Sequence, residues 1–433
     1  MEAEDGRMRM RKVLKTAETL ETPEMTAGKT EISKCRIVCD FLWSLMGVAL
    51  MHAVLQFWFY PQMNRIYGPE WMGKILFLVS WVSVFVMAFG IALDNTRLVT
   101  RFRFHAENGD FNLLLIFFSG IALLCCFPAH LLVFPESSPW VFALWVILTL
   151  VRFYSAVEFR LTINTKGYFV YHALLALGYA VGASLMCRGL DWMWAFCLGE
   201  AAALGYAAFV GKIYRPPFWK HENLKKTFHS AMTLAGAGLL NQGGQNLDRI
   251  VLPVLVGALA NTQFYVVSLL GKILSMFTAP MNSVLISYLC QTDKKMRRKD
   301  FLLLSGAVVM VAGVFGGGCW IATPYFLRVF YADLYERTAS LVFIATLGQV
   351  VGFSSMLLLT AVLTVTEEKW QLRIQGIYAL LFIVLAVPMT KMWGLWGFAM
   401  AILSANSVRF GCAFVLGFVK TSAEDHPKKG RIL

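Results

Sequence analysis

The stretch MGKILFLVSWVSVFVMAFGIAL, residues 72–93, carries one charged side chain, Lys74, near its start. An apolar run of this length is enough to cross the ~30 Å hydrocarbon core of a bilayer as a single helix. Water is absent from that core, so a helix, which satisfies its own backbone hydrogen bonds, is the favoured form. Residues 72–93 therefore predict a membrane-spanning helix.

Eleven further segments resemble this one in length and polarity. They are 37–60, 112–134, 138–157, 168–187, 191–211, 228–257, 261–290, 301–325, 338–365, 372–390 and 394–419. Of the 433 residues, 58% are hydrophobic and only 15% are charged, whereas soluble domains are nearer half and a quarter. The chain is thus predicted to be an all-α integral membrane protein with about twelve transmembrane helices.

Lysine and arginine residues are unevenly distributed between the two sides of the membrane that the predicted helices cross. One side collects 30 of the 39, in the amino tail, in alternate loops such as those with Arg97, Arg152 and Arg160, and in the carboxyl tail. The other side collects six. The excess predicts that both termini are cytoplasmic. The net charge of +13 is distributed over short loops, with no continuous basic face for nucleic acid.

The stretch KIYRPPFWKHENLKKTF, residues 212–228, divides the segments into six before and six after. Its aromatic and basic residues predict a piece that lies along the cytoplasmic interface. The predicted parts are a polar cytoplasmic tail (1–35), a first six-helix lobe (36–211), an amphipathic linker (212–227), a second six-helix lobe (228–419) and a cytoplasmic tail (420–433). Two halves of equal helix number are common in transporters.

Three cations, Arg249, Lys272 and Arg409, fall inside apolar segments of the second half. A charge in the bilayer is costly and persists where it faces a wet cavity or a partner. The three can line one cationic cavity, which suits a phosphate or pyrophosphate. The polar residues expected to line it are Asn241, Gln245, Asp248 and Asn406. The alternative is structural: an ion pair of Asp248 with Lys272, and Arg249 reaching outward.

The first half offers two carboxylates, Glu200 and Asp40, as candidates for ion coupling during transport. For Glu200, a hydrogen bond to a neighbouring helix is an equally good interpretation. The nine cysteines form no metal-binding pattern, no Walker A sequence is present, and the polar loops are too short for an ordinary active site. We therefore expect no enzyme activity, metal or cofactor.

Three stretches carry a resemblance to a known family. QNLDRIVLPVLVGALANTQFYVVSLLGKILSMFTAPMNSVLISYL, residues 245–289, resembles the Asp-Arg-containing seventh helix and the eighth helix of Wzx-type polysaccharide flippases, which share a superfamily with the MATE exporters. FGIALDNTRLVTR (89–101) and GLWGFAMA (394–401) resemble the family's segment after helix two and the start of its helix twelve. Asp94 and Asn95 depart from the family's usual small residue and Gly, which leaves the subfamily open.

The resemblance implies a MATE-like fold and a flippase of the bacterial inner membrane, acting in O-antigen or capsule biosynthesis. Its substrate would be an undecaprenyl-pyrophosphate-linked oligosaccharide, moved from the cytoplasmic to the outer leaflet. Bilayer lipid, a glycan polymerase and glycosyltransferases are the implied partners. The alternatives are a cation-coupled multidrug antiporter of the same fold and a membrane polysaccharide polymerase or ligase. The short outer loops disfavour the last.

Overall fold

The computed structural model describes residues 34–103, 107–216, 218–219, 223–276, 297–363, 366 and 368–421. Most of the two predicted tails and residues 277–290 of the predicted eighth segment lie outside this part. Every element within it is helical. The statements below concern the described residues.

The first half contains six helical passages. In chain order its elements are α2 (Lys34–Val54), the π-helical η1 (Leu55–Phe59), α3 (Tyr60–Arg103), α4 (Asn108–Val133), α5 (Pro139–Ser155), α6 (Val157–Leu161), α7 (Thr165–Met186) and α8 (Trp192–Val210). Gly68, with φ of 81°, breaks α3 just before Pro69. Glycine adopts this left-handed conformation without a steric penalty. The break separates the first passage from the second.

The second half also contains six helical passages. Its elements are α9 (Leu224–Leu255), α10 (Ala258–Met276), α12 (Arg298–Phe330), α13 (Ala332–Thr338), η2 (Ala339–Leu341), α14 (Val342–Leu363) and α15 (Glu368–Lys420). Trp393 and Gly394 leave helical geometry and divide α15 in two. Eight helical stretches among the described residues are long and apolar enough to cross a membrane, two of them containing the breaks. With α9 and α10 they make up twelve passages, which confirms the predicted fold class.

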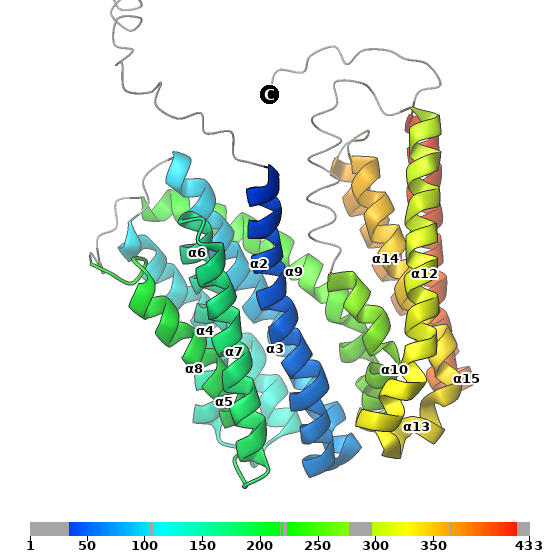
Figure 1. The fold of residues 1–433 in the computed structure, drawn as a ribbon, viewed down its shortest axis with the longest axis horizontal. Coiled ribbons are helices and arrows are strands. Elements are labelled where there is room, and N and C mark those ends of the chain that lie inside the picture. Colours follow the sequence, from blue (N-terminus) through cyan, green and yellow to red (C-terminus); the bar gives the residue numbers. More distant parts are fainter. Residues whose placement is uncertain are drawn as a thin grey trace, which may run out of the picture.

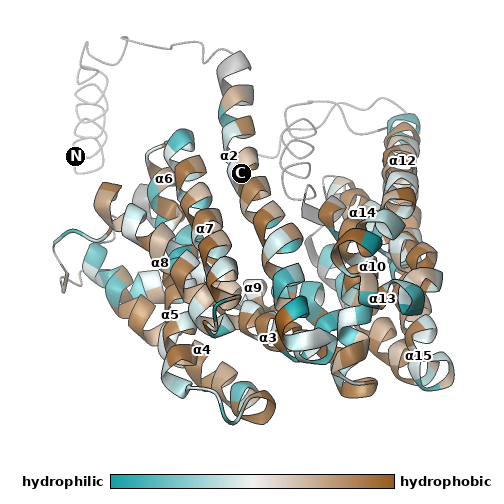
Figure 2. Cartoon of the chain, turned by 60° about the horizontal axis from the view of Figure 1, so that its bottom comes forward, coloured by the Kyte–Doolittle hydropathy of each residue, from teal (hydrophilic) through white to brown (hydrophobic). Residues whose placement is uncertain are grey.

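The helices form two groups, one from each half of the chain (Figure 1). In the first, α2 packs on α7 and α7 on α8, while in the second α14 packs on α15 and α12 on α14. Helix α9 runs between the groups and lies along α3 of the first. Hydrophobic residues cover most of the helix lengths (Figure 2), and leucines such as Leu124 and Leu132 are largely exposed, as expected of a lipid-facing surface.

Besides the long contact of α9 with α3, the two halves meet where the start of the second passage lies against the start of α10. We call this second contact the lobe junction. The Asn261 amide donates to the Gly73 carbonyl at 2.9 Å, and the Thr262 hydroxyl donates to the Pro69 carbonyl at 2.6 Å. A Cβ on Gly73 would lie only 1.8 Å from the Ala258 carbonyl oxygen. The backbones therefore approach as closely as glycine alone permits.

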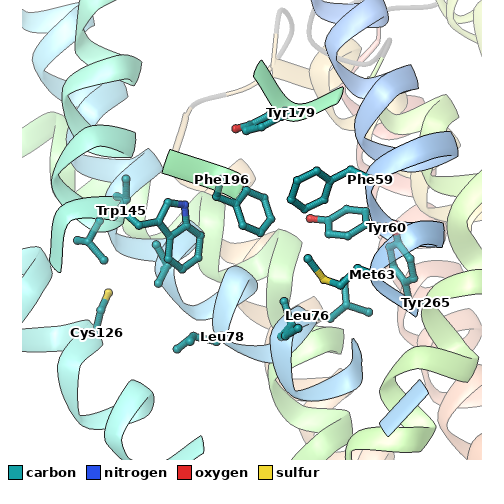
Figure 3. Packing of buried hydrophobic residues seen from close by; sticks show 14 of the residues in the cluster. Phe59, Tyr60, Met63, Leu76, Leu78, Cys126, Trp145, Tyr179, Phe196 and Tyr265 are labelled. Atoms are coloured by element: carbon teal, nitrogen blue, oxygen red, sulfur yellow. The ribbon is translucent and has the colours of Figure 1, made fainter. Parts of the chain in front are cut away.

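Aromatic rings continue the junction inward. Tyr60 packs edge-on against Tyr265 at 5.7 Å between ring centroids, and Phe57 packs against Phe326 at 5.7 Å. Figure 3 shows Tyr60 and Tyr265 beside Phe59 and Met63 in the buried cluster. The Tyr265 hydroxyl also hydrogen-bonds the Gln56 side chain. Residues from both halves thus form one packed region at this end.

We expect Gly73→Ala to loosen the lobe junction, because the added methyl group collides with backbone rather than with a movable side chain. Overpacking of this kind costs about 1–3 kcal/mol. Spin labels at the exposed positions Arg65 and Arg337 would report a longer or broader distance distribution between the halves. Gly120→Ala is the matched control, since nothing lies within 4 Å of the added carbon. Identical distributions in all three proteins would show that the junction does not depend on this contact.

Candidate functional site

Helix α9 presents a polar face near the middle of its length. Asn241 and Gln245 are exposed, and the Gln245 amide donates to the Asn241 side-chain oxygen at 3.3 Å. Amide groups exposed to hydrocarbon would lose their hydrogen bonds to water without replacement. This polar face of α9 is better suited to a hydrated space than to lipid.

Lys272 of α10 forms an ion pair with Asp248 of α9. Their side chains are 18% and 11% exposed. This is the Asp248–Lys272 ion pair that the sequence analysis gave as the structural alternative to a cationic cavity. The Lys272 charge is compensated within the protein, so this residue has less capacity for an external anion than the sequence suggested.

Arg249 lies one residue along α9 from that pair and has a different environment. Its guanidinium sits over the Tyr265 ring, 5.0 Å from the centroid. Its Nε is buried and has no hydrogen-bond partner, and no carboxylate pairs with it among the described residues. A buried donor without a partner is costly. Among the described residues, no paired carboxylate therefore balances the Arg249 charge.

Arg409 of α15 is 7% exposed and is held by uncharged groups. Its hydrogen-bond acceptors are the Ser355 hydroxyl at 2.7 Å, the Gly352 carbonyl at 3.1 Å, the Asn406 side chain at 2.9 Å and the Gln375 side chain at 3.3 Å. The guanidinium also stacks over Tyr378, 4.2 Å from the ring centroid. These neutral contacts orient the cation without cancelling its charge, and no carboxylate in the described part of the chain pairs with it.

The three cations lie on three helices of the second half. Helix α9, with Arg249, packs on α10, with Lys272, and also on α15, with Arg409. Together with Asp248 they comprise three cations and one carboxylate. We call Arg249, Lys272 and Arg409, together with Asp248, the cationic cluster.

Glu200 lies outside the cationic cluster and has a cation of its own. Its carboxylate accepts from Arg152 Nε at 2.6 Å and from the Tyr179 hydroxyl at 2.8 Å. The side chains of Arg152 and Glu200 are 9% and 2% exposed. The charge count had placed Arg152 among the cytoplasmic loop cations, but it lies inside the first helical group. Glu200 is therefore a member of a buried ion pair.

Asp40 occupies the first turns of α2 and accepts a hydrogen bond from the Thr165 hydroxyl at 2.9 Å. Thr165 begins α7, so the contact ties together the ends of two neighbouring helices. Asp40 is not part of the cationic cluster. Its role in ion coupling stays a prediction.

Several residues around the site were not singled out from the sequence. Arg152 escaped notice because it stands at the end of an apolar run, where a snorkelling loop cation is the usual interpretation. Ser355, Gln375 and Tyr378 gave no signal either, because small polar and aromatic residues are frequent in membrane helices. Within the described ranges, no three His, Cys, Asp or Glu residues lie together as metal ligands would.

We expect Arg152→Ala to lower the thermal stability of the purified protein strongly, because it leaves the Glu200 charge buried and unpaired. Removing one partner of a buried ion pair costs about 3–5 kcal/mol. Unfolding in detergent would be followed by tryptophan fluorescence. Glu200→Gln, which retains a hydrogen-bonding group for Tyr179, should be milder, and the exposed Glu136→Gln should have no effect. An unchanged melting temperature in Arg152→Ala would contradict a structural role for the pair.

Solved structures of other proteins share the fold of this chain. No family profile and no curated sequence matches the chain. Among solved structures, an inward-facing multidrug resistance MATE family transporter of the MOP superfamily aligns with TM-score 0.66 and 11% identity, over 87% of this chain and 97% of that one. An outward-facing transporter of the same description aligns with TM-score 0.61 and 12% identity, over 88% and 94%. The Vibrio cholerae MATE transporter VcmN in its bent form aligns with TM-score 0.53 and 10% identity, over 88% and 95%. The chain therefore has the fold of MATE-type transporters.

Proposed function

We propose that this protein is a flippase for an anionic, lipid-linked oligosaccharide, with undecaprenyl-pyrophosphate as the carrier. The observation that carries the proposal is the uncompensated positive charge of the cationic cluster. Among the described residues, Asp248 is the one carboxylate that forms an ion pair with any of the three cations, and its partner is Lys272. Buried charge without a counter-charge is strongly unfavourable unless a ligand supplies that charge during function.

The physical task of such a flippase fits this arrangement. A sugar-pyrophosphate head cannot cross hydrocarbon alone, because its polar groups lose water without replacement. The exposed amides of Asn241 and Gln245 offer hydrogen bonds to sugar hydroxyls along the face of α9. Arg249 and Arg409 offer planar guanidinium groups, which match phosphate oxygens in pairs. The polyprenyl tail remains in the bilayer throughout.

Movement of the two helical groups against each other would expose the cluster to each side in turn. In this proposal the lobe junction closes one side while the head group enters from the other. Breaking the contacts of Gly73 and Thr262, with compensating contacts at the far end, would then release the head group. The glycan polymerase and glycosyltransferases of the pathway are the proposed partners, and the bacterial inner membrane is the proposed location.

A cation-coupled drug antiporter is the second candidate, because two of the solved neighbours are described as multidrug resistance transporters. That function needs a carboxylate free to exchange a proton or metal ion against a cationic drug. Glu200 and Asp248 are both paired with cations in the structure. Asp40 is the remaining candidate from the sequence. Extrusion of cationic dyes that is abolished by Asp40→Asn would favour this alternative.

We expect Arg249→Ala and Arg409→Gln to slow translocation of lipid-linked oligosaccharide in proteoliposomes by roughly ten-fold or more, since a hydrogen bond to a charged group contributes about 1.5–3 kcal/mol. Arg409→Gln retains neutral hydrogen bonds to Ser355 and Asn406, which protects folding. Arg188→Ala removes an exposed cation remote from the cluster and serves as the control. Wild-type rates in both folded variants would eliminate the cationic cluster as the binding site.

The Lys272–Asp248 pair allows a separate test. We expect Lys272→Met alone to reduce the yield of folded protein, because Asp248 is then buried without a partner. The double variant Lys272→Met/Asp248→Leu should recover the yield and keep most of the transport rate, as buried ion pairs are often replaceable by apolar side chains. Yield after size-exclusion chromatography and the proteoliposome rate would be measured together. A well-folded but inactive double variant would instead make Lys272 a direct contact of the substrate.

A further inference from the structure

The linker between the two halves is fastened to the first half by its backbone. The Asn108 amide at the start of α4 donates to the carbonyls of Lys212 and Arg215, at 3.3 Å and 2.7 Å. The Asn112 amide donates to the Phe218 carbonyl at 3.1 Å. The Glu158 carboxylate accepts from the Ile213 backbone N–H at 3.2 Å. Three side chains thus hold the linker against the ends of α4 and α6.

This fastening gives the linker an inner and an outer face. Ile213 is 2% exposed, and Tyr214 packs against Tyr154 and hydrogen-bonds Ser155. Lys212 and Arg215, by contrast, are exposed. The carbonyls that Asn108 ties down belong to these same two residues. The backbone is therefore anchored while both cationic side chains are presented outward.

Exposed aromatic side chains precede and follow those cations along the chain. Phe209, in the last turn of α8, is 87% exposed, and Trp219 is 67% exposed. Phe209 ends a passage through the membrane, so this surface starts where hydrocarbon gives way to head groups. Tryptophan favours that boundary, and cations near it attract anionic lipid.

We propose that Lys212 and Arg215, flanked by Phe209 and Trp219, form a binding site for the head group of an anionic phospholipid. The positive charge count places this surface in the cytoplasmic leaflet. The phosphate lies against the two cations, while the rings settle at the level of the head groups and acyl chains. Because Asn108 and Glu158 fasten the site to the first half, a bound lipid holds that half at a fixed depth and leaves the second half free to move.

The test compares retention of phosphatidylglycerol and phosphatidylcholine by the full-length protein after exchange in mixed micelles, measured by mass spectrometry. Wild-type protein should retain phosphatidylglycerol preferentially. Lys212→Gln/Arg215→Gln should lose that preference by roughly five-fold for each removed cation. Lys212→Arg/Arg215→Lys should keep it. Asn108→Leu keeps both cations but frees the linker backbone, so it should reduce the preference as well.

Arg188→Gln/Lys391→Gln is the matched control, because it removes two exposed cations on the opposite side of the membrane. It should retain phosphatidylglycerol as the wild type does. The site would be overturned by an unaltered preference in the Lys212→Gln/Arg215→Gln protein, or by an equal loss in the control, which would indicate a general charge effect. This test does not depend on the transported substrate, so it stands or falls separately from the flippase proposal.

Discussion

Hydrocarbon offers no hydrogen bond and no counter-ion, so every polar group between these helices needs a partner from within the protein or from its ligand. The two halves of the chain meet this constraint differently. In the first half, Arg152 and Glu200 neutralise each other and Tyr179 completes the network. In the second half, the described partners of Arg409 are all neutral groups, and Arg249 has an aromatic face and a buried donor without a partner in the described part of the chain. In the proposed flippase, this asymmetry puts the anion-binding cations in the second half.

The neutral partners of Arg409 orient its guanidinium group but do not neutralise its charge. A carboxylate beside Arg409 would lower the cost of its burial but would also compete with a bound phosphate. Hydroxyl, amide and carbonyl oxygens at 2.7–3.3 Å hold the guanidinium in place while its net charge survives. A cation that is held in position but not neutralised can bind an anion without first being reoriented. The proposed transport cycle requires such a cation, because the anion must be bound and then released in each round.

Much of the fold was predictable because the bilayer makes each spanning helix visible as an apolar run. The twelve segments and the division at the linker follow from that constraint alone. The partners of the charges were less accessible, since a sequence gives the face of a helix but not the helix that lies opposite. Arg152 shows the difficulty: its position at the end of an apolar run suits a loop cation, and only packing against α8 reveals its pairing with Glu200. The break at Gly68, by contrast, falls within residues 61–71, the gap that the sequence already left between its first two apolar segments.

Tyr265 connects the cationic cluster with the lobe junction. Its ring lies beneath the Arg249 guanidinium, and its hydroxyl hydrogen-bonds the Gln56 side chain of the first half. Phe59, three residues after Gln56, belongs to the buried hydrophobic cluster. In the proposed cycle, separation of the halves would break the bond to Gln56 and free the ring that supports Arg249. A ligand can shift a conformational equilibrium only by binding one state better than the other. In the proposed cycle an anion on Arg249 would meet that condition, because the Tyr265 ring beneath the guanidinium is held through Gln56 only while the halves are joined. In that cycle, Tyr265 would couple occupation of the site to opening of the junction.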